Sequence, residues 1–277
     1  MQGPGLPDQG CDRVRGPDPR QLCPGAGGLC GGRAGCRGRE LTRREPLSPF
    51  EAGRARRLDA LASRPGLRAV IARLLRSPAL LPFVDGPALL LPQRFNIESR
   101  HRVLQVGCGS GALADSLQRL VRFDGAPVGV DVSRRLLADG GALAERVQAS
   151  GAALPFGREV FDLVLLGHVV SQLDDDTLAL TLREARRVLV PGGVCLLWDY
   201  RPSGVRALER LNRWVIGVAA PGRPRMRSTW QLVTAASEAA FGSIRVMNWG
   251  PFYWPPIPRT TLLLRKRDSS RSPRHQV

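Results

Sequence analysis

The chain has 277 residues, of which 43% are hydrophobic, so it is long enough and apolar enough for one large α/β domain with additions. Its formal net charge is +17, and the basic excess lies before residue 100 and after residue 200, whereas residues 101–200 are nearly neutral. No apolar run approaches the roughly 20 residues of a membrane span, which excludes a transmembrane segment.

Residues 1–45 are rich in Gly, Pro and Arg and lack hydrophobic periodicity, which predicts a disordered tail. They contain neither the apolar core of a signal peptide nor the amphipathic run of a transit peptide, so we expect a cytoplasmic protein. Cysteines occur in this tail at spacings wider than those of structural zinc pairs, and we expect no metal site. The tail cysteines are Cys11, Cys23, Cys30 and Cys36. We interpret Cys108 and Cys195 as small buried residues of a reduced protein.

Residues 46–99 are predicted to form a helical segment. Apolar periodicity predicts helices over Pro49–Ser63 and Pro65–Arg76, the second with a clear apolar stripe. Ala79–Leu91 is the most apolar stretch of the chain, but an aspartate, a glycine and two prolines interrupt it. We therefore expect it to pack against the rest of the protein, with a peripheral lipid contact as the alternative.

The stretch Arg102–Ala112, RVLQVGCGSGA, joins a buried strand to a glycine turn and then to a helix over Gly111–Leu120. Glycines allow a cofactor to approach the backbone, and the free N–H groups at the helix start point at it. Two patterns fit this turn. One is the dinucleotide fingerprint G-x-G-x-x-G/A, and the other is the G-x-G-x-G turn of class I S-adenosylmethionine-dependent methyltransferases.

The stretch Pro127–Ser133, PVGVDVS, predicts a short strand that ends at Asp131, about 20 residues beyond the glycine turn. An acid at this place can accept both ribose hydroxyl hydrogen bonds of an adenosine, so it suits NAD and S-adenosylmethionine equally. The structural alternative is that Asp131 or Ser133 caps a helix over Arg134–Val147.

Three further motifs decide between the two cofactors. They are SGAALPF at Ser150–Phe156, VFDLVLLGHVVSQL at Val160–Leu173 and LREARRVLVPGGVCLLWD at Leu182–Asp199. Together with the glycine turn, their order and spacing resemble class I methyltransferases, most closely the small-molecule group similar to ubiquinone and menaquinone biosynthesis methyltransferases. The resemblance extends in good register over about residues 100–199.

The resemblance implies an α/β fold over residues 100–267, a Rossmann-like seven-stranded sheet with a reversed last strand and an N-terminal helical cap over residues 46–99. It implies S-adenosylmethionine as cofactor and methyl transfer to a small-molecule O, N or C acceptor, without a metal. It places cofactor contacts at Gln105, Gly107, Cys108, Gly109, Ser110, Gly111, Asp131, Val132, Ser150, Gly151, Ala152, Gly167 and His168.

Two positions depart from the family pattern. Where the family usually has an acid two residues before the first glycine, this chain has Gln105, and where an acid usually receives the adenine amino group, it has Ser150. Both side chains accept hydrogen bonds, but neither brings a charge. A degenerate, non-catalytic cofactor-binding module therefore stays open as an alternative.

His168 is the candidate catalytic residue. A strand over Phe161–Leu166 places Gly167 and His168 at the edge of the sheet where open α/β folds bind ligands. A histidine there could take a proton from a hydroxyl or amine acceptor, or it could only pack beside the cofactor. Next, the pattern predicts a helix over Thr177–Leu189, and a Pro-Gly-Gly end that leads into a strand over Val194–Trp198.

Beyond residue 200, the pattern predicts helices over Gly204–Val218 and Ser228–Phe241. Ser243–Trp249 and Thr260–Lys266 resemble the closing antiparallel hairpin of the family's sheet. Residues 268–277 are polar and are predicted to be a disordered tail.

Candidate substrate contacts are Arg225, Tyr253 and Trp254. Aromatic residues between prolines suit the cover of an apolar or planar substrate, and a guanidinium on the preceding loop, from Arg225 or its neighbour Arg227, suits a carboxylate or phosphate. Alternatively, the aromatics only seal the end of the sheet and the arginines are solvated. The basic C-terminal flank also keeps an RNA or protein methyltransferase open, with nucleic acid as a less favoured partner.

Overall fold

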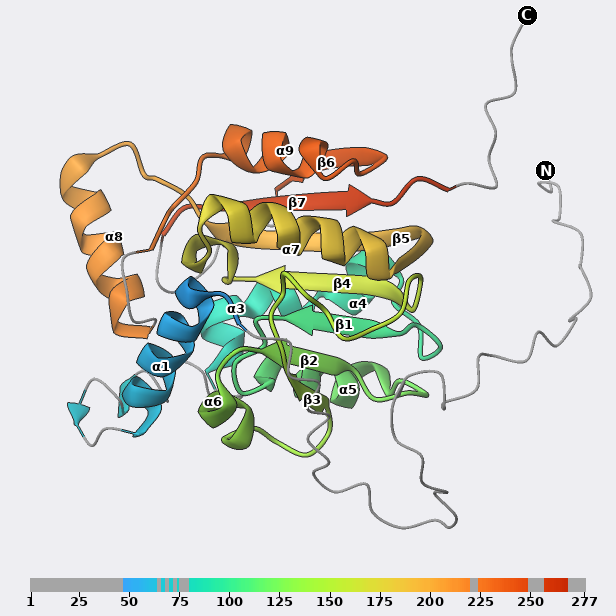
Figure 1. The fold of residues 1–277 in the computed structure, drawn as a ribbon, viewed down its shortest axis with the longest axis horizontal. Helices are drawn as coiled ribbons and strands as arrows, with labels where there is room; N and C mark the ends of the chain where they lie inside the picture. The colour runs from blue at the N-terminus through green and yellow to red at the C-terminus, as the bar shows by residue number, and fades with distance from the viewer. Residues whose placement is uncertain are drawn as a thin grey trace, which may run out of the picture. The chain divides into compact units, whose positions relative to one another are not determined.

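The structure is a computed structural model, and its described residues are 47–63, 66–67, 70–71, 74, 80–219, 224–248 and 257–268. At their centre lies a seven-stranded sheet with the strand order β3-β2-β1-β4-β5-β7-β6 (Figure 1). The strands are β1 Val103–Val106, β2 Val128–Asp131, β3 Glu145–Gln148, β4 Phe161–Gly167, β5 Leu189–Tyr200, β6 Ser243–Met247 and β7 Arg259–Arg265. Strand β7 runs antiparallel to β5 and β6, whereas the pairs among β1 to β5 are parallel. The predicted sheet with a reversed last strand is therefore confirmed.

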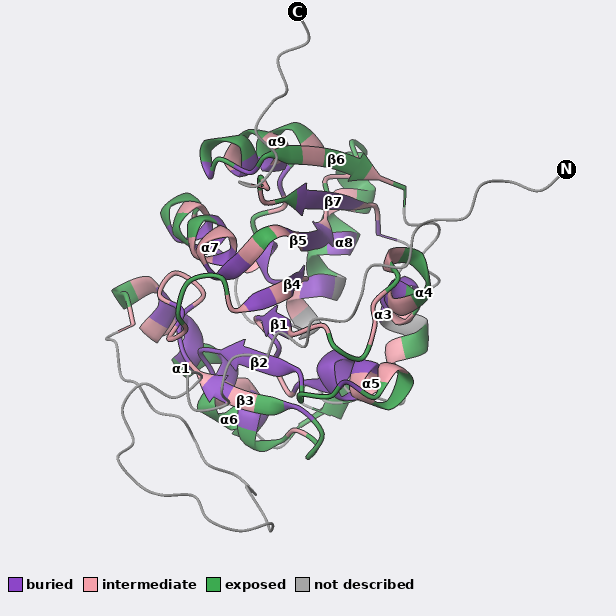
Figure 2. Ribbon diagram, turned by 90° about the vertical axis from the view of Figure 1, so that its right-hand side faces the viewer, coloured by how far each residue is buried: buried purple, intermediate pink, exposed green. Residues whose placement is uncertain are grey.

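Helices cover both faces of this sheet. They are α1 Pro49–Ser63, α3 Leu81–Leu89, α4 Leu91–Phe95, α5 Ala112–Val121, α6 Arg134–Ala138, the 3-10 helix η2 Val170–Gln172, α7 Asp175–Val188, α8 Arg206–Ala219 and α9 Thr229–Glu238. Helices α7 and α9 pack on one face, and α3, α4 and α5 pack on the other (Figure 2). In the described part of the chain, none of these helices has the length and apolar character to cross a membrane.

The core explains why the central strands read as continuous apolar runs. Successive side chains of a strand point to opposite faces, so β4 contributes Val164 and Leu166 to the layer under α7, and Leu163 and Leu165 to the layer under α5. Figure 2 shows the buried strands between the two helix layers. The core therefore fixes the central strands and leaves their carboxyl ends free to carry polar groups.

Several element predictions are confirmed. Helix α1 spans the predicted residues, and α7 begins after Asp174, whose side chain accepts a hydrogen bond from the N–H of Thr177. The C-terminal helices form as α8 and as α9, which begins at a capping box on Ser228, and the closing hairpin forms as β6 and β7.

Two element predictions are wrong. The helix expected over Arg134–Val147 ends at Ala138, and its second half contains strand β3. The Pro-Gly-Gly segment lies inside β5, because that strand already begins at Leu189 and pairs there with Phe161 before its register shifts. Other predicted segments lie outside the described residues. They are residues 1–45, residues 269–277, most of the helix predicted over Pro65–Arg76 and the loop with Tyr253 and Trp254.

Parallel pairing brings the carboxyl ends of β1, β2, β3 and β4 to one edge of the sheet. Helix α1 lies at this edge, on the side toward which β1 and β4 point in Figure 1. It packs against α6, and the hydroxyl of Ser133, just after β2, donates a hydrogen bond to Asp59 of α1. The predicted cofactor residues and the N-terminal helix therefore meet at the same edge.

Candidate functional site

The glycine turn after β1 has a backbone that requires glycine. Gly107, Gly109 and Gly111 have φ values of 72°, 57° and 81°, in the left-handed region. The N–H of Gly107 donates to the carbonyl of Val130 in β2 at 2.7 Å. A Cβ atom on Gly107 would lie 2.4 Å from Cγ2 of Val169, so a side chain there would collide with the segment after β4.

Asp131 ties the glycine turn to the end of β2. Its Oδ2 accepts a hydrogen bond from the N–H of Gly109 at 2.8 Å, and its Oδ1 accepts one from the N–H of Ser133 at 2.9 Å. The side chain of Ser133 accepts a hydrogen bond from Leu136 and so caps α6. Because Ser133 caps that helix, the Asp131 carboxylate remains directed at the glycine turn.

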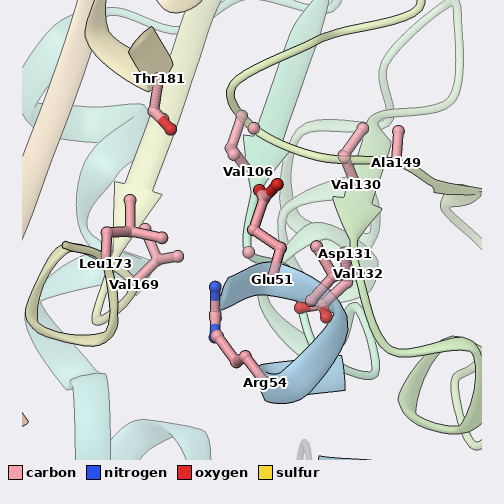
Figure 3. Close-up of a pocket in the computed structure, with 12 residues that line it drawn as sticks. Glu51, Arg54, Val106, Val130, Asp131, Val132, Ala149, Val169, Leu173 and Thr181 are labelled. Atoms are coloured by element: carbon pink, nitrogen blue, oxygen red, sulfur yellow. The ribbon is translucent and has the colours of Figure 1, made fainter. Parts of the chain in front are cut away.

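A pocket with about 290 Å³ of empty space lies at this edge (Figure 3). Its lining is Glu51, Arg54, Val106, Gly107, Val130, Asp131, Val132, Ala149, Gly151, Val169, Leu173 and Thr181. Within the described ranges, no three His, Cys, Asp or Glu side chains gather as a metal ion would require.

Four of the predicted cofactor contacts line this pocket, namely Gly107, Asp131, Val132 and Gly151. A Cβ atom on Gly151 would lie 2.8 Å from Cγ1 of Val106, so glycine keeps this wall of the pocket open. The pocket therefore brings together the ends of β1, β2 and β3.

Ser150 and Ala152 form a tight turn beside the pocket. The Ser150 hydroxyl accepts a hydrogen bond from the N–H of Ala152 at 2.9 Å and donates one to the Glu51 carboxylate. A carboxylate thus reaches Ser150 from α1, although the sequence has no acid at that position of the loop.

The other predicted contacts lie near the pocket without lining it. They are Gln105, Cys108, Gly109, Ser110, Gly111, Gly167 and His168. Gln105 is 6% exposed within β1, and its Oε1 has no hydrogen-bond partner among the described residues. Burial raises the pKa of the Cys108 thiol well above its usual value, and the Asp131 carboxylate adds to the rise, so the thiol stays protonated.

His168, the residue that follows β4, has a strained conformation. Its φ of 55° is in the left-handed region, which is unfavourable for a non-glycine residue and is often found at functional sites. Its backbone N–H donates to the carbonyl of Trp198 at 2.9 Å, and its ring stacks on Tyr200 with 4.6 Å between the ring centroids. Gly167 has to be a glycine because a Cβ atom there would lie 2.4 Å from the Trp198 indole.

The carboxylate of Asp85, in α3, lies next to the His168 ring. Oδ1 of Asp85 lies 3.4 Å from Nε2 of His168, and its Oδ2 accepts a hydrogen bond from the Trp198 indole at 3.0 Å. Asp85 is 4% exposed, and its Oδ1 and both ring nitrogens of His168 are buried without a hydrogen-bond partner in the described part of the chain. Burial raises the pKa of the neighbouring Tyr200, and Arg259 opposes this rise. Buried polar atoms without partners are rare, so the unpaired atoms of Asp85 and His168 indicate a functional site.

The predicted substrate arginines have different surroundings. Arg225 is exposed, and its backbone N–H donates to the carbonyl of Ser171 at 2.7 Å. Arg227 is 7% exposed, and its guanidinium donates to the carbonyls of Val170 and Leu173 at 2.7 and 2.8 Å. Arg227 therefore holds η2 in place, and the interpretation of this residue as a solvated side chain is wrong.

Sequence reasoning missed Glu51, Arg54, Asp85 and Thr181. A signal existed for the first two, because Glu51 and Arg54 continue the buried stripe of α1 at helical spacing. Charged residues at core positions of an amphipathic helix indicate a polar partner across the interface. No comparable pattern marks Asp85 or Thr181, whose Oγ1 is also buried without a partner among the described residues.

Comparisons with known proteins agree with this geometry. Residues 104–197 match a family described as "Methyltransferase domain". The chain is 35% identical over 152 residues to a 2-phytyl-1,4-naphtoquinone methyltransferase from Synechococcus elongatus, a match that covers 50% of this chain and 64% of the relative. It is 33% identical over 112 residues to a demethylmenaquinone methyltransferase from Staphylococcus saprophyticus, covering 38% of this chain and 47% of the relative. The chain thus spans less than two thirds of these relatives.

Among solved structures, human N-acetylserotonin methyltransferase in complex with SAM superposes with a TM-score of 0.58 at 16% identity, covering 76% of this chain and 59% of that chain. At this identity the likeness shows the fold alone. The domain match extends from β1 into β5 and contains the glycine turn, Asp131 and His168. The domain match, the seven-stranded sheet with its reversed last strand and the named relatives together support a class I S-adenosylmethionine-dependent methyltransferase.

Proposed function

We propose that this protein transfers a methyl group from S-adenosylmethionine to a small-molecule acceptor. The observation that carries the proposal is the pocket at the carboxyl edge of the sheet, where the glycine turn and the Asp131 carboxylate meet. When bound, the cofactor supplies an electrophilic methyl group on a sulfonium. The protein then has to bind both reactants, align them in line and exclude water.

The residues present fit this cofactor. Glycine is required at Gly107 and Gly151 because a Cβ atom would collide with Val169 or Val106, and both glycines line the pocket. The Asp131 carboxylate has lone pairs left after its two backbone hydrogen bonds, and it can accept the ribose hydroxyls. Gln105, Ser150 and the rest of the predicted set belong to this proposal as the surrounding contacts.

In this proposal, His168 removes a proton from the acceptor. With Nε2 directed at the Asp85 carboxylate, the other ring nitrogen, Nδ1, can accept a proton from a hydroxyl. The carboxylate stabilises the imidazolium that results, and the Trp198 indole holds the carboxylate. Asp85 acts on the reaction through His168 and is a positioning residue.

The acceptor that suits this site is an aromatic small molecule with an ionisable hydroxyl. The names of the relatives point to naphthoquinone-type compounds as the class to test first. The ring of Tyr200 stacked on His168 offers an aromatic surface next to the base. Arg225, Tyr253 and Trp254 remain the proposed contacts on the acceptor side.

Calorimetry with S-adenosylhomocysteine tests the cofactor part. We expect binding by the full chain, and at least a tenfold weaker affinity in Asp131→Ala, because one or two hydrogen bonds to a charged acceptor are lost. The absence of binding by the unmodified chain, or equal binding by the variant, would contradict the proposal.

A screen of quinols and phenols with methyl-labelled cofactor tests the reaction. Once an acceptor is found, His168→Gln should lower kcat at least about a hundredfold. Asp85→Asn should lower kcat less and leave cofactor affinity unchanged, because Asp85 is not among the proposed cofactor contacts. Partial rescue of a His168→Ala variant by added imidazole would separate a role in proton transfer from a role in packing. Full activity in His168→Gln would refute the assignment.

A further inference from the structure

Helix α1 presents two buried charges of opposite sign to the pocket. Glu51 is 3% exposed and Arg54 is 7% exposed, and both line the pocket. Their spacing of three residues places them on one face of the helix. In Figure 3, the Glu51 side chain extends toward Val106, whereas that of Arg54 extends toward the side of the pocket that carries Val169. Neither residue lies within the matched domain, residues 104–197.

The Arg54 guanidinium has unmet hydrogen-bonding capacity. Its Nη2 donates to Oε1 of Gln172 in η2 at 3.1 Å, but its buried Nε has no partner among the described residues. Burial lowers the pKa of Arg54, although the carboxylates of Asp131 and Glu51 oppose this shift. A buried donor without an acceptor is unfavourable, and a carboxylate is the group that a guanidinium pairs with best.

The two oxygens of the Glu51 carboxylate have different surroundings. Oε2 accepts hydrogen bonds from the backbone N–H and the hydroxyl of Ser48, at 3.2 and 3.0 Å, and so closes the first turn of α1. Oε1 accepts the hydrogen bond from the Ser150 hydroxyl at the end of β3, beside the pocket residue Gly151. One oxygen therefore stabilises the helix, and the other is directed at the pocket.

Helix α1 is anchored to the segment that follows β2, beside the pocket. Oδ1 of Asp59 accepts hydrogen bonds from the hydroxyl of Ser133 and from the backbone N–H of Arg135 at 3.2 Å. Both donors follow directly after β2, whose last residue is Asp131. The helix is thus tied to the proposed ribose site, and its side chains will contact any ligand that fills a pocket of about 290 Å³.

The partners of the two charges lie on opposite sides of β2 in the strand order, because Glu51 binds Ser150 after β3 and Arg54 binds Gln172 after β4. An adenosine cofactor whose ribose binds Asp131 has its base on one side of the sugar and its amino-acid chain on the other. The glycine turn follows β1, on the η2 side of β2 in the strand order. A sulfonium beside this turn would direct the amino-acid chain toward Arg54 and the base toward Glu51.

We propose that α1 forms half of the cofactor site, in which Arg54 binds the α-carboxylate of S-adenosylmethionine and Glu51 accepts a hydrogen bond from the adenine amino group. This inference rests on the proposed function. It provides the acid that the loop at Ser150 lacks, from a segment that precedes the matched domain.

Ligand truncation tests the role of Arg54. Calorimetry on the full chain compares S-adenosylhomocysteine with 5′-methylthioadenosine, which lacks the amino-acid end. Arg54→Gln should weaken the first ligand about tenfold to a hundredfold, because a charge-assisted hydrogen bond is lost, and should leave the second unchanged. Arg54→Lys should retain part of the preference. Arg56→Gln, at an exposed position of the same helix, is the matched control and should bind both ligands normally.

A change in the base tests the role of Glu51. S-inosylhomocysteine has a carbonyl oxygen in place of the adenine amino group, so position 6 of its base accepts hydrogen bonds and cannot donate one to a carboxylate. The unmodified chain should prefer S-adenosylhomocysteine at least about tenfold, and Glu51→Gln should lose most of that preference. The glutamine side chain still has an oxygen that can accept the Ser48 hydrogen bonds, so the start of α1 is retained.

The outcomes separate this inference from the proposed function. If the unmodified chain binds neither S-adenosylhomocysteine nor methylthioadenosine, the proposed function fails. If it binds both, but Arg54→Gln and Glu51→Gln behave like Arg56→Gln, the inference alone is wrong. Tighter binding in either variant would also overturn it, because α1 would then obstruct the pocket instead of forming part of it.

Discussion

Gly107 and Gly109 share a positive φ but differ in what surrounds them. A Cβ atom at Gly107 would meet Val169 at 2.4 Å, whereas one at Gly109 would meet nothing within 4 Å. The pair therefore separates backbone strain from steric collision at the centre of the proposed cofactor site. Gly109→Ala carries only the cost of a left-handed residue, about 1 to 2 kcal/mol.

We expect Gly107→Ala to be less stable than Gly109→Ala by about 1 to 3 kcal/mol, because overpacking against Val169 adds to the same backbone strain. Denaturant unfolding of both variants measures this difference. A Gly107→Ala, Val169→Ala double variant has a smaller side chain at position 169, so it should recover part of the lost free energy of unfolding. Equal stability of the two single variants would mean that the segment after β4 moves aside freely.

Arg227 and Arg225 form a second matched pair, two residues apart. Arg227 is buried and also pairs with Asp175 at 2.7 Å, whereas the Arg225 side chain is exposed. Arg227→Ala should destabilise the fold by about 2 to 4 kcal/mol, because the carbonyls of Val170 and Leu173 each lose a buried charged donor. Arg225→Ala should change the stability by less than about 0.5 kcal/mol.

Thermal unfolding measures the stability of both arginine variants, and kinetics with an identified acceptor gives the second half of the test. Arg225→Ala should raise the acceptor KM if Arg225 binds that substrate. An unchanged KM would limit the acceptor site to the region around His168. A stable Arg227→Ala variant would show that η2 is held by its other contacts.

At the level of elements, the turn after β3 is fixed to α7 by one ion pair. Arg187 donates to the carbonyls of Phe156 and Leu154 at 2.8 and 3.1 Å, and Glu184 accepts a hydrogen bond from the N–H of Leu154 at 2.9 Å. Arg187 and Glu184 also bind each other at 2.6 Å. This clamp holds the loop that begins at Ser150, so it frames one wall of the pocket.

Removing the clamp should have a pH-dependent cost. Burial alone would raise the pKa of Glu184, but the hydrogen bonds from Arg187 and Leu154 outweigh it, and the pKa lies below its usual value. A carboxyl group with a lowered pKa stabilises the fold above its unfolded pKa of about 4.3, and this contribution disappears as the pH falls through the folded pKa.

We expect Glu184→Gln to lose about 1 kcal/mol at pH 7, a modest amount because the carboxylate is partly exposed. The difference from the unmodified chain should shrink as the pH falls below about 4.3 and vanish below the folded pKa of Glu184. Denaturant unfolding across pH 3 to 8 checks this, within the range where the chain remains folded. A pH-independent difference would mean that the loss comes from packing and not from the charge.

The elements that the sequence predicted are those with strong periodicity or a cap. Strand β4 and helix α7 combine continuous or helical apolar patterns with an N-cap at Asp174, and both were found. Strand β3 was missed because only Val147 of its four residues is buried, so it has no alternating pattern. The glycine pair after Asp139 was the available stop signal for α6, and apolar residues beyond it obscured that signal.

The part of the candidate site that comes from neighbouring segments of the sequence was predictable. The contacts between residues far apart in the sequence were not. The glycine turn and Asp131 come from one βαβ unit, so local spacing determines their proximity. Asp85 approaches His168 across 83 positions of sequence only after α3 packs beside β5, and no local pattern encodes that contact. The same holds for Arg54 and Gln172, which lie on separate elements.

At the scale of the whole molecule, the fold concentrates chemistry at one edge of an apolar sheet. The pocket, the His168 cluster and α1 all lie where the parallel strands end. The charge does not follow the same distribution, because the excess of arginine lies before residue 100 and after residue 200. A reaction on a nucleic acid would use these arginines to bind phosphates, whereas the proposed small-molecule reaction does not require them.

Salt dependence separates these two uses of the arginines. Ion pairs in a buried pocket are little affected by screening, so raising the salt from about 50 to 200 mM should change the affinity for S-adenosylhomocysteine by less than about threefold. A protein that neutralises 6 to 10 phosphates of a nucleic acid loses about 10³ to 10⁵ in affinity over the same range. Calorimetry with the cofactor product, and fluorescence anisotropy with a labelled RNA oligonucleotide, provide the two measurements. Tight, salt-sensitive RNA binding that raises the turnover of the methyl donor would contradict the small-molecule proposal, and it would assign the basic flanks to a polymer substrate.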